Sequence, residues 1–430
     1  MKTLTPNEIV SLVLSLGLML IIARLVGELF RKFNMPLVVG ELVAGVFFGP
    51  SLFGNYYPQL SQFIFNTEGN AAYAINGITS ISVIMLLFVA GMEVDLSLIR
   101  QQGKTALKTS FVGLIVPLLL GYLAAFYFYP LFGEAPADNL HRVVFSLFIG
   151  TAMAVSALPV IARTLMDLGL FRTKIGTIII AAAMFDDVIG WLMFSVILGM
   201  LNSTSHSYGF LVTFGLTTLY AVGMLTVGRF IINKSLPWAK KNFSWPGGFL
   251  SISFGLAFLG AAFTEAIHIH AIFGAFIVGI AFGDSVHLTE KTREIVNQFV
   301  NNIFAPLFFV SIGFTLNFVE HFNLQISVLV LVLAVVCKLL GAGLGAKWGG
   351  LTNKESLAVG FGMNARGAME IILAILALQV GLIKEELFVA IVIMAVVTSI
   401  MAGPALQLLL KNQLTEPTQK PEEDNEVYTS

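Results

Sequence analysis

Long apolar stretches separated by short polar segments follow one another along almost the whole chain. Apolar runs of about 20 residues recur between Asn7 and Leu410, and a helix of that length crosses a hydrocarbon core of about 30 Å. Hydropathy and helix-breaking residues divide the chain into thirteen predicted spans. These spans run over residues 7–29, 36–50, 75–99, 106–130, 142–162, 175–200, 209–232, 248–265, 269–283, 301–317, 325–346, 355–380 and 386–410. The pattern predicts an all-α polytopic membrane protein whose residues 1–411 form one transmembrane domain.

The composition agrees with this class and excludes others. Apolar residues make up 57% of the chain and charged residues 11%, whereas a soluble domain carries about 25% charged residues. The net charge of -1 offers no basic excess, so we expect no nucleic-acid partner. No nucleophile or cofactor-binding pattern is present, so we expect neither an enzyme nor a cofactor. Residues 412–430 are polar, and we predict a short disordered cytoplasmic tail there.

Lysine and arginine alternate between the predicted loops and thereby indicate an orientation. Nineteen of the 24 fall on one side, three (Lys2, Arg142 and Lys384) fall on the other, and two lie within spans. The side rich in these residues is the cytoplasmic one. We therefore expect the N-terminus outside and the C-terminus in the cytoplasm, in a bacterial inner membrane.

Four ionisable residues lie at membrane depth, where they are costly and usually functional. Asp186 and Asp187 come 12 and 13 residues after Lys174, which places them about 18 to 20 Å into the membrane. By the same measure Lys338 and Arg366 lie about 14 and 18 Å deep. Two acids and two bases thus share the middle of the bilayer.

These charges allow more than one interpretation. Consecutive helical residues point about 100° apart, so one aspartate can pair with Lys338 while its neighbour faces water. The alternative is that charge pairs merely lock helices together, but stability alone does not need two adjacent carboxylates. Glu370 lies four residues after Arg366 on the same helix face. That pair is open to a structural or a functional role.

Two predicted spans contain residues that interrupt a helix in mid-membrane. The fifth contains Thr151, Ser156 and Pro159, and the twelfth contains Asn364 and Gly367 among further glycines. Either interruption alone could be an ordinary kink. The two spans are seven apart and therefore cross in opposite directions, as expected if spans four to six and eleven to thirteen form an inverted repeat. Matching broken helices in inverted halves indicate a transport site.

Seven sequence blocks, in order, resemble those of one transporter family. They are VGELVAGVFFGPSLFG, LLFVAGMEVD, SALPVIARTLMDLG, AAAMFDDVIGW, IHAIFGAFIVGIAFG, FAPLFFVSIGFTLNF and GFGMNARGAMEI. Over nearly all of residues 7–410 the chain resembles the monovalent cation/proton antiporters of the sodium/hydrogen exchanger superfamily, in the cation/proton antiporter-2 branch. The resemblance implies a homodimer in which a six-helix core with two crossing broken helices slides against a scaffold.

The resemblance also implies roles for individual residues. Asp187 matches the aspartate that carries the transported Na⁺ or K⁺ and the proton, Asp186 matches its acidic neighbour, and Lys338 matches the lysine that pairs with Asp186. Ser156 matches a position that helps to coordinate the ion. The charged positions of the second crossing helix are matched by Arg366 and Glu370.

The sequence therefore predicts a secondary active antiporter that exchanges a monovalent cation, with Na⁺ expected, for H⁺ by alternating access. If cation and proton compete for Asp187, the site cannot hold both, and exchange follows. The Asp186-Asp187 pair resembles electrogenic sodium antiporters, whereas SALPVIAR resembles plant and fungal exchangers that usually carry Asn at the first acid. K⁺/H⁺ exchange or K⁺ efflux is the alternative. A non-transporting membrane sensor or scaffold with this fold is an alternative of another class, against which the buried charges argue.

Overall fold

The structure is a computed structural model, and every regular element that it describes is a helix. It describes residues 4–32, 35–65, 69–94, 104–135, 138–171, 173–201, 210–243, 246–267, 269–285 and 287–414. Within these ranges eleven helices are long and apolar enough to cross a membrane, or twelve when one bent pair counts as a span. The predicted span 269–283 is a shorter apolar helix, Ala271–Gly283. The all-α membrane fold is confirmed, while the number of thirteen spans stays a prediction.

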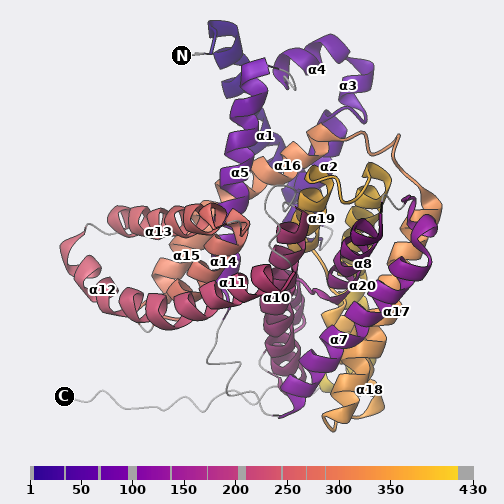
Figure 1. The fold of residues 1–430 in the computed structure, drawn as a ribbon. Helices are drawn as coiled ribbons and strands as arrows, with labels where there is room; N and C mark the ends of the chain where they lie inside the picture. Colours follow the sequence, from indigo (N-terminus) through magenta and orange to yellow (C-terminus); the bar gives the residue numbers. More distant parts are fainter. Residues whose placement is uncertain are drawn as a thin grey trace, which may run out of the picture.

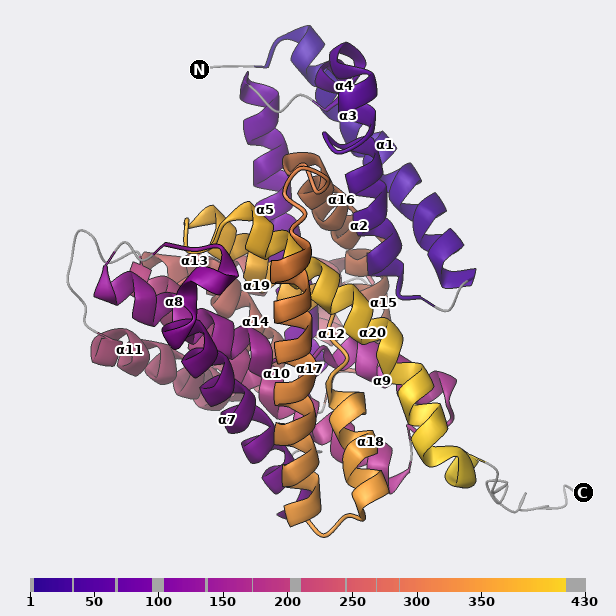
Figure 2. The ribbon, with the colours of Figure 1, turned by 90° about the vertical axis from the view of Figure 1, so that its right-hand side faces the viewer.

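One set of helices, which we call the core bundle, contains the two interrupted spans (Figures 1 and 2). Its members pack mainly on one another, with α7 and α17 side by side. They are α7 (Lys104–Tyr127), α8 (Asn139–Ala154), α9 (Leu158–Asp167), α10 (Lys174–Leu201), α17 (Leu324–Trp348), α18 (Asn353–Met363), α19 (Ala368–Gln379) and α20 (Glu385–Leu414).

The second set, the scaffold, packs beside the core bundle (Figure 1). It comprises α1 (Pro6–Lys32), α2 (Leu37–Phe48), α5 (Gly69–Met92), α13 (Gly247–Ala266), α14 (Ala271–Gly283) and α16 (Ala305–Thr315). The remaining helices are α3 (Phe53–Tyr56), α4 (Pro58–Ile64), η1 (Tyr129–Phe132), α11 (Phe210–Gly223), α12 (Arg229–Asn242) and α15 (Glu290–Phe299). Of these, α11 and α12 belong to the candidate span Phe214–Asn242, and α15 begins the candidate span Glu290–Phe314. Two π-helical turns, η2 (Met224–Gly228) and η3 (Val300–Phe304), complete the fold.

Small residues let the scaffold helices approach closely, as is usual between membrane helices. A Cβ atom on Gly45 of α2 would lie 2.4 Å from the carbonyl oxygen of Val310 in α16. A Cβ atom on Gly91 of α5 would lie 2.1 Å from the carbonyl oxygen of Phe276 in α14. Any larger residue at Gly45 or Gly91 would push these helix pairs apart.

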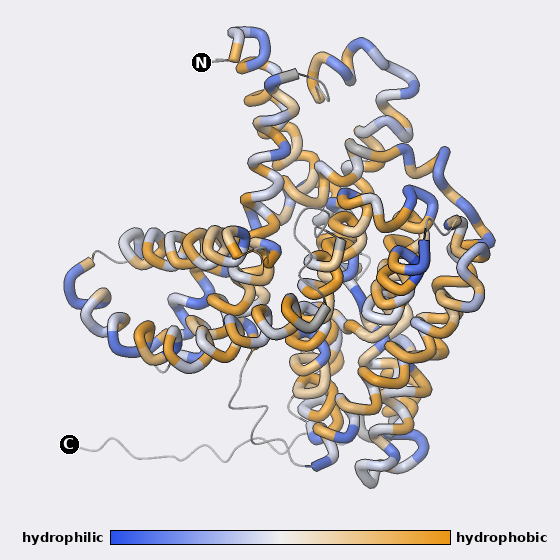
Figure 3. The backbone as a smooth tube through the Cα atoms, viewed as in Figure 1, coloured by the Kyte–Doolittle hydropathy of each residue, from blue (hydrophilic) through white to orange (hydrophobic). Residues whose placement is uncertain are grey.

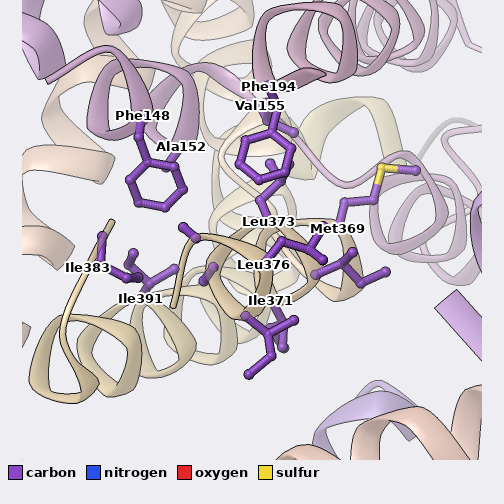
Figure 4. Packing of buried hydrophobic residues seen from close by; sticks show 14 of the residues in the cluster. Phe148, Ala152, Val155, Phe194, Met369, Ile371, Leu373, Leu376, Ile383 and Ile391 are labelled. Carbon is purple, nitrogen blue, oxygen red and sulfur yellow. The ribbon is translucent and has the colours of Figure 1, made fainter. Parts of the chain in front are cut away.

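Apolar residues predominate along the helices, and polar residues gather toward loops and helix ends (Figure 3). Inside the core bundle, apolar side chains pack around the interrupted spans (Figure 4). Phe148 of α8, Phe194 of α10, and Leu373 and Ile391 of α19 and α20 are each at most 1% exposed. This packing surrounds the interrupted helices with apolar side chains.

Several helix limits differ from the predicted spans. The predicted span 75–99 contains a helix that begins at Gly69 and ends at Met92, and its last residues, 95–99, lie outside the described residues. The predicted span 209–232 continues through the π-helical turn η2 into α12, because helical backbone persists after the apolar stretch ends. Helix α20 extends to Leu414, three residues beyond the predicted domain end at 411. The rest of the predicted tail, 415–430, lies outside the described residues.

Candidate ion-binding site

The fifth predicted span is broken between α8 and α9. Helix α8 ends at Ala154, and Val155 has extended backbone angles, φ -68° and ψ 149°. Pro159 lies in the first turn of α9. Proline has no N–H and its ring opposes a helix that continues through it. The residues between the two half-helices therefore have backbone groups that need partners elsewhere.

The twelfth predicted span is broken between α18 and α19, which meet at a bend of 48°. The two breaks contact each other directly, because the N–H of Ala157 donates to the carbonyl oxygen of Ala365 at 3.0 Å. A Cβ atom on Gly367 would lie 2.8 Å from Val160 Cγ2 and 3.3 Å from Ala157 Cβ. Glycine therefore allows the close approach, and the predicted crossing of two broken helices is present.

Two positively charged side chains bind the carbonyl groups that the break leaves without partners at the end of α8. Arg366 donates to the carbonyl oxygens of Ala152 and, at 2.7 Å, Met153. Lys338 donates to the carbonyl oxygen of Ala154. The C-terminal end of a helix carries partial negative charge, which nearby cations stabilise. Arg366 and Lys338 are both fully buried.

The carboxylate of Asp186 is held by direct contacts from three elements. Lys338 Nζ lies 2.6 Å from Asp186 Oδ2, so the predicted contact between these residues is present. Ser156 Oγ in the break donates to Oδ2 at 3.2 Å, and Ser110 Oγ of α7 donates to Oδ1 at 3.4 Å. Both oxygens of Asp186 are thus engaged, and its charge is balanced by a buried ammonium group.

Asp187 is in the opposite situation. It is 1% exposed, and neither carboxylate oxygen has a hydrogen-bond partner among the described residues. Asp187 therefore does not face water, although the sequence left that arrangement possible. Helix α10 is enclosed by α7, α8, α9 and α18, so turning away from Lys338 does not bring Asp187 to solvent. Three acids, Glu370, Asp186 and Glu93, act on it electrostatically, and the charge of Lys338 opposes them.

Arg366 and Glu370 do not form the expected contact. Among the described residues no ion pair joins them, because Arg366 lies in the break rather than on α19 and points to the α8 carbonyl groups. Glu370 Oε2 instead accepts the N–H of Gly367 at 2.8 Å, at the start of α19. An acid in the first turn suits the positive end of a helix. The expectation of an i,i+4 pair on one helix face is wrong.

The remaining predicted residues differ in how close they come to the site. Thr151 Oγ1 donates to the carbonyl oxygen of Leu147 at 2.8 Å, within its own helix. Asn364 ends α18 and is 1% exposed, with both side-chain amide atoms lacking a partner in the described part of the chain. Asn364 is therefore a second buried polar group that is available to a ligand. Pro159 lines a large cavity between core bundle and scaffold.

Sequence reasoning missed several polar residues, among them Ser110 and Glu41. Ser110 gave no signal, because a serine in a membrane helix is ordinary and only the fold brings it to Asp186. Glu41 lies inside the predicted span 36–50 and is 6% exposed. The rule that selected Asp186 and Asp187, that an acid within a span is functional until shown otherwise, would have selected it too.

Comparison with known proteins places this geometry in a wider context. The family model described as "Sodium/hydrogen exchanger, transmembrane" matches residues 17–412. The Na⁺/H⁺ antiporter NhaS4 of Synechocystis is 31% identical over 89% of this chain and 93% of its own length. The K⁺/H⁺ antiporter 1 of Saccharomyces cerevisiae is 28% identical over 93% of this chain, which spans only 47% of that relative. The solved structure of the sodium proton antiporter MjNhaP1 of Methanocaldococcus jannaschii aligns with a TM-score of 0.65 at 18% identity, over 95% of this chain and 98% of that one.

Proposed function

The chain belongs to the sodium/hydrogen exchanger family, whose members are transporters, and from this premise we propose that it exchanges Na⁺ for H⁺ at Asp187. Monovalent cation/proton antiport is the activity that its relatives carry in their names. The observation that carries the assignment to Asp187 is its carboxylate, buried and without a hydrogen-bond partner among the described residues.

Asp187 can exchange ligands because its charge must always be balanced. An isolated carboxylate costs several kcal/mol at membrane depth, so a proton or a cation has to neutralise it. Both cannot occupy it together. Since the neutralised site can move between the two faces and the empty charged site cannot, each cation that crosses in one direction is matched by protons in the other. The buried setting of Asp187 thus supports coupled exchange.

Asp186 and Lys338 set the electrostatics beside that carboxylate. Their 2.6 Å contact keeps Asp186 balanced while Asp187 binds a proton. A cation that enters between the two carboxylates weakens this contact, and Lys338 can then release its own proton. Ser156 and Asn364 are neutral oxygen donors at the same crossing and suit a hard cation. The arrangement favours more than one proton for each cation.

The crossing of the two breaks supports movement of the site as one body. The hydrogen bond between Ala157 and Ala365 and the contacts of Arg366 tie the half-helices together. The scaffold has its own close contacts through Gly45 and Gly91. We therefore propose that the core bundle moves relative to the scaffold and carries Asp187 between the two membrane faces.

The cation is identified by transport of purified protein. Reconstituted liposomes containing a pH-sensitive dye receive Na⁺, Li⁺ or K⁺ in separate experiments. We expect Na⁺ to give the lowest half-saturating concentration. A response to K⁺ alone would instead assign K⁺/H⁺ exchange, which the relative from Saccharomyces cerevisiae makes the second candidate. The absence of a response to any cation would favour a sensor or scaffold.

Orientation and assembly are further parts of the proposal. The lysine and arginine pattern supports a cytoplasmic C-terminus and an external N-terminus in a bacterial inner membrane. Helix α1 presents the apolar side chains of Val10 and Val13, each more than half exposed, to lipid or to a second copy. We propose a homodimer, which cross-linking through Val13→Cys would detect in membranes.

A further inference from the structure

A cavity of about 770 Å³ lies between the scaffold helices α1 and α2, the π-helical turn η3, and the core helices α9 and α19. Neither Asp186 nor Asp187 lines it. The ionisable side chains in its wall are Arg24, Glu41, Glu93, Arg163 and Asp167. Because the cavity separates core bundle from scaffold, it lies where relative movement of the two would open a path.

Both arginine residues in the wall are engaged by other groups. Arg24 pairs with Glu28 at 2.7 Å and donates to Asn302 Oδ1 at 3.2 Å. Arg163 pairs with Asp167 at 3.8 Å. Two other carboxylates of the wall, those of Glu41 and Glu93, form no ion pair within the described ranges, and the charges of Arg24 and Arg293 act on them without direct contact.

Glu41 is the more deeply buried of these two acids. It is 6% exposed, and its Oε2 has no hydrogen-bond partner in the described part of the chain. A Cβ atom on Gly40 would lie 2.6 Å from Gly27 Cα, so α1 and α2 are in close contact at this level. A Cβ atom on Gly27 would lie 3.8 Å from Glu41 Cγ. The close contact of the helices thus holds the carboxylate at the cavity wall.

Glu93 brings oxygen donors to the same wall. It follows the last residue of α5, and Asn297 Nδ2 donates to its Oε1 at 3.3 Å. One turn beyond Asn297, the chain forms the π-helical turn η3, from which Asn301 and Asn302 line the cavity. Single π-helical turns recur at functional sites. Carboxylate and amide oxygens are the ligands that hard cations prefer.

We propose that Glu41 and Glu93 form a vestibular site that binds a hydrated monovalent cation on its way to Asp187. The volume admits a cation together with its water, since each water occupies about 30 Å³ in the liquid. The site increases the local concentration of cations at one face, as charged clefts do. The inference rests on the proposed antiport function and deepens it.

The test compares the cation dependence of exchange at the two membrane faces. Everted and right-side-out vesicles are prepared with wild type, Glu41→Gln, Glu93→Gln, Glu41→Asp and Glu290→Gln. Glu290 is 90% exposed, lies outside the cavity and serves as the matched control. Initial rates of Na⁺-driven proton movement then give KM and kcat at each face.

Removing a carboxylate charge from the vestibular site weakens the attraction of cations to the cavity. It does not alter the exchange of cation and proton at Asp187. At low ionic strength, we expect Glu41→Gln and Glu93→Gln to raise KM about threefold to tenfold at the membrane face from which cations enter the cavity. The value of kcat should change less than about twofold. The effect should shrink when choline chloride screens the charge. Glu41→Asp and Glu290→Gln should keep the wild-type KM, and no variant should change KM at the other face.

Wild-type KM at both faces for Glu41→Gln and Glu93→Gln would overturn the vestibular site and leave the assignment of Asp187 intact. An equal rise in KM at both faces would also overturn it. If Glu41→Gln does not fold, Glu93→Gln decides the question alone. Wild-type exchange by Asp187→Asn is a separate outcome that overturns the proposed function itself.

Discussion

The N–H of Ala157 and the carbonyl oxygen of Ala365 are 3.0 Å apart and join the two broken helices at their crossing. One break thereby satisfies a backbone group of the other, in a region where water is not at hand to do so. Since Gly367 also fits against Val160 and Ala157 there, the two breaks form a single packed unit. A conformational change must carry both together.

Arg366 should contribute more to stability than a surface arginine does. Arg366→Gln leaves the carbonyl groups of Ala152 and Met153 buried without their charged donor, and we expect a loss of about 3 kcal/mol in the free energy of unfolding. Arg163→Gln, at an exposed i,i+4 pair, should change it by less than about 0.5 kcal/mol. Unfolding by SDS titration in mild detergent measures both. Equal effects would contradict the role of Arg366.

Lys338 and Asp186 should behave as a pair. Lys338→Ala leaves a buried carboxylate without its counter-charge, and we expect a loss of about 3 to 5 kcal/mol. The double variant Lys338→Ala with Asp186→Asn removes both charges and should recover part of that loss. The same SDS titration gives the coupling free energy of the cycle. Additive effects of the two single substitutions would show that the contact is not energetically important.

The sequence predicted the parts of the site that depend on a single charged or helix-breaking residue within an apolar span. Asp186, Lys338 and the interruptions at Pro159 and Gly367 are all visible as violations of helical or apolar pattern. It could not predict contacts that depend on helix rotation. Whether Arg366 reaches Glu370 or the α8 carbonyl groups is decided by the geometry of the break, and no local pattern encodes that geometry.

Glu134, in the loop before α8, should make stability depend on pH. Burial raises its pKa above the ordinary value of 4.5, although the N–H of Lys384 at 2.7 Å and the Lys384 charge oppose the shift. A raised pKa means that the folded state binds the proton more tightly than the unfolded state. The contribution of Glu134 is therefore full below pH 4.5 and is lost as pH rises through the higher folded value.

The Glu134→Gln variant removes this ionisation. Melting temperatures measured from pH 4 to pH 8 should show the wild type losing stability relative to Glu134→Gln as the pH increases. Lys384 retains an acceptor for its N–H in the variant, so the comparison isolates the charge. Parallel profiles across the range would show that ionisation of Glu134 costs the folded protein nothing.

The stoichiometry of exchange should depend on Asp186. With Lys338 held by Asp186, cation binding displaces one proton from Asp187 and one from Lys338, so two protons move for each cation. Asp186→Asn removes the partner of Lys338 and should leave one-for-one exchange at Asp187. Proteoliposomes with the potential clamped by K⁺ and valinomycin distinguish the two cases. Wild-type Na⁺/H⁺ exchange should respond to the potential and Asp186→Asn should not, whereas a wild type that ignores the potential would exclude the two-proton scheme.

Transport by Asp187→Asn tests the central assignment most directly. Asparagine has nearly the same shape as aspartate but cannot alternate between a proton and a cation's charge. The matched control is Asp138→Asn, which makes the same change at the N-cap of α8, where Asn caps as well as Asp. In proteoliposomes of equal protein content, we expect Asp187→Asn to lose Na⁺-driven proton flux by about a hundredfold or more. A hundredfold loss corresponds to about 2.7 kcal/mol in the free-energy barrier of transport. Asp138→Asn should retain the wild-type flux. Near-wild-type flux from folded Asp187→Asn would contradict the account and place the transport site elsewhere.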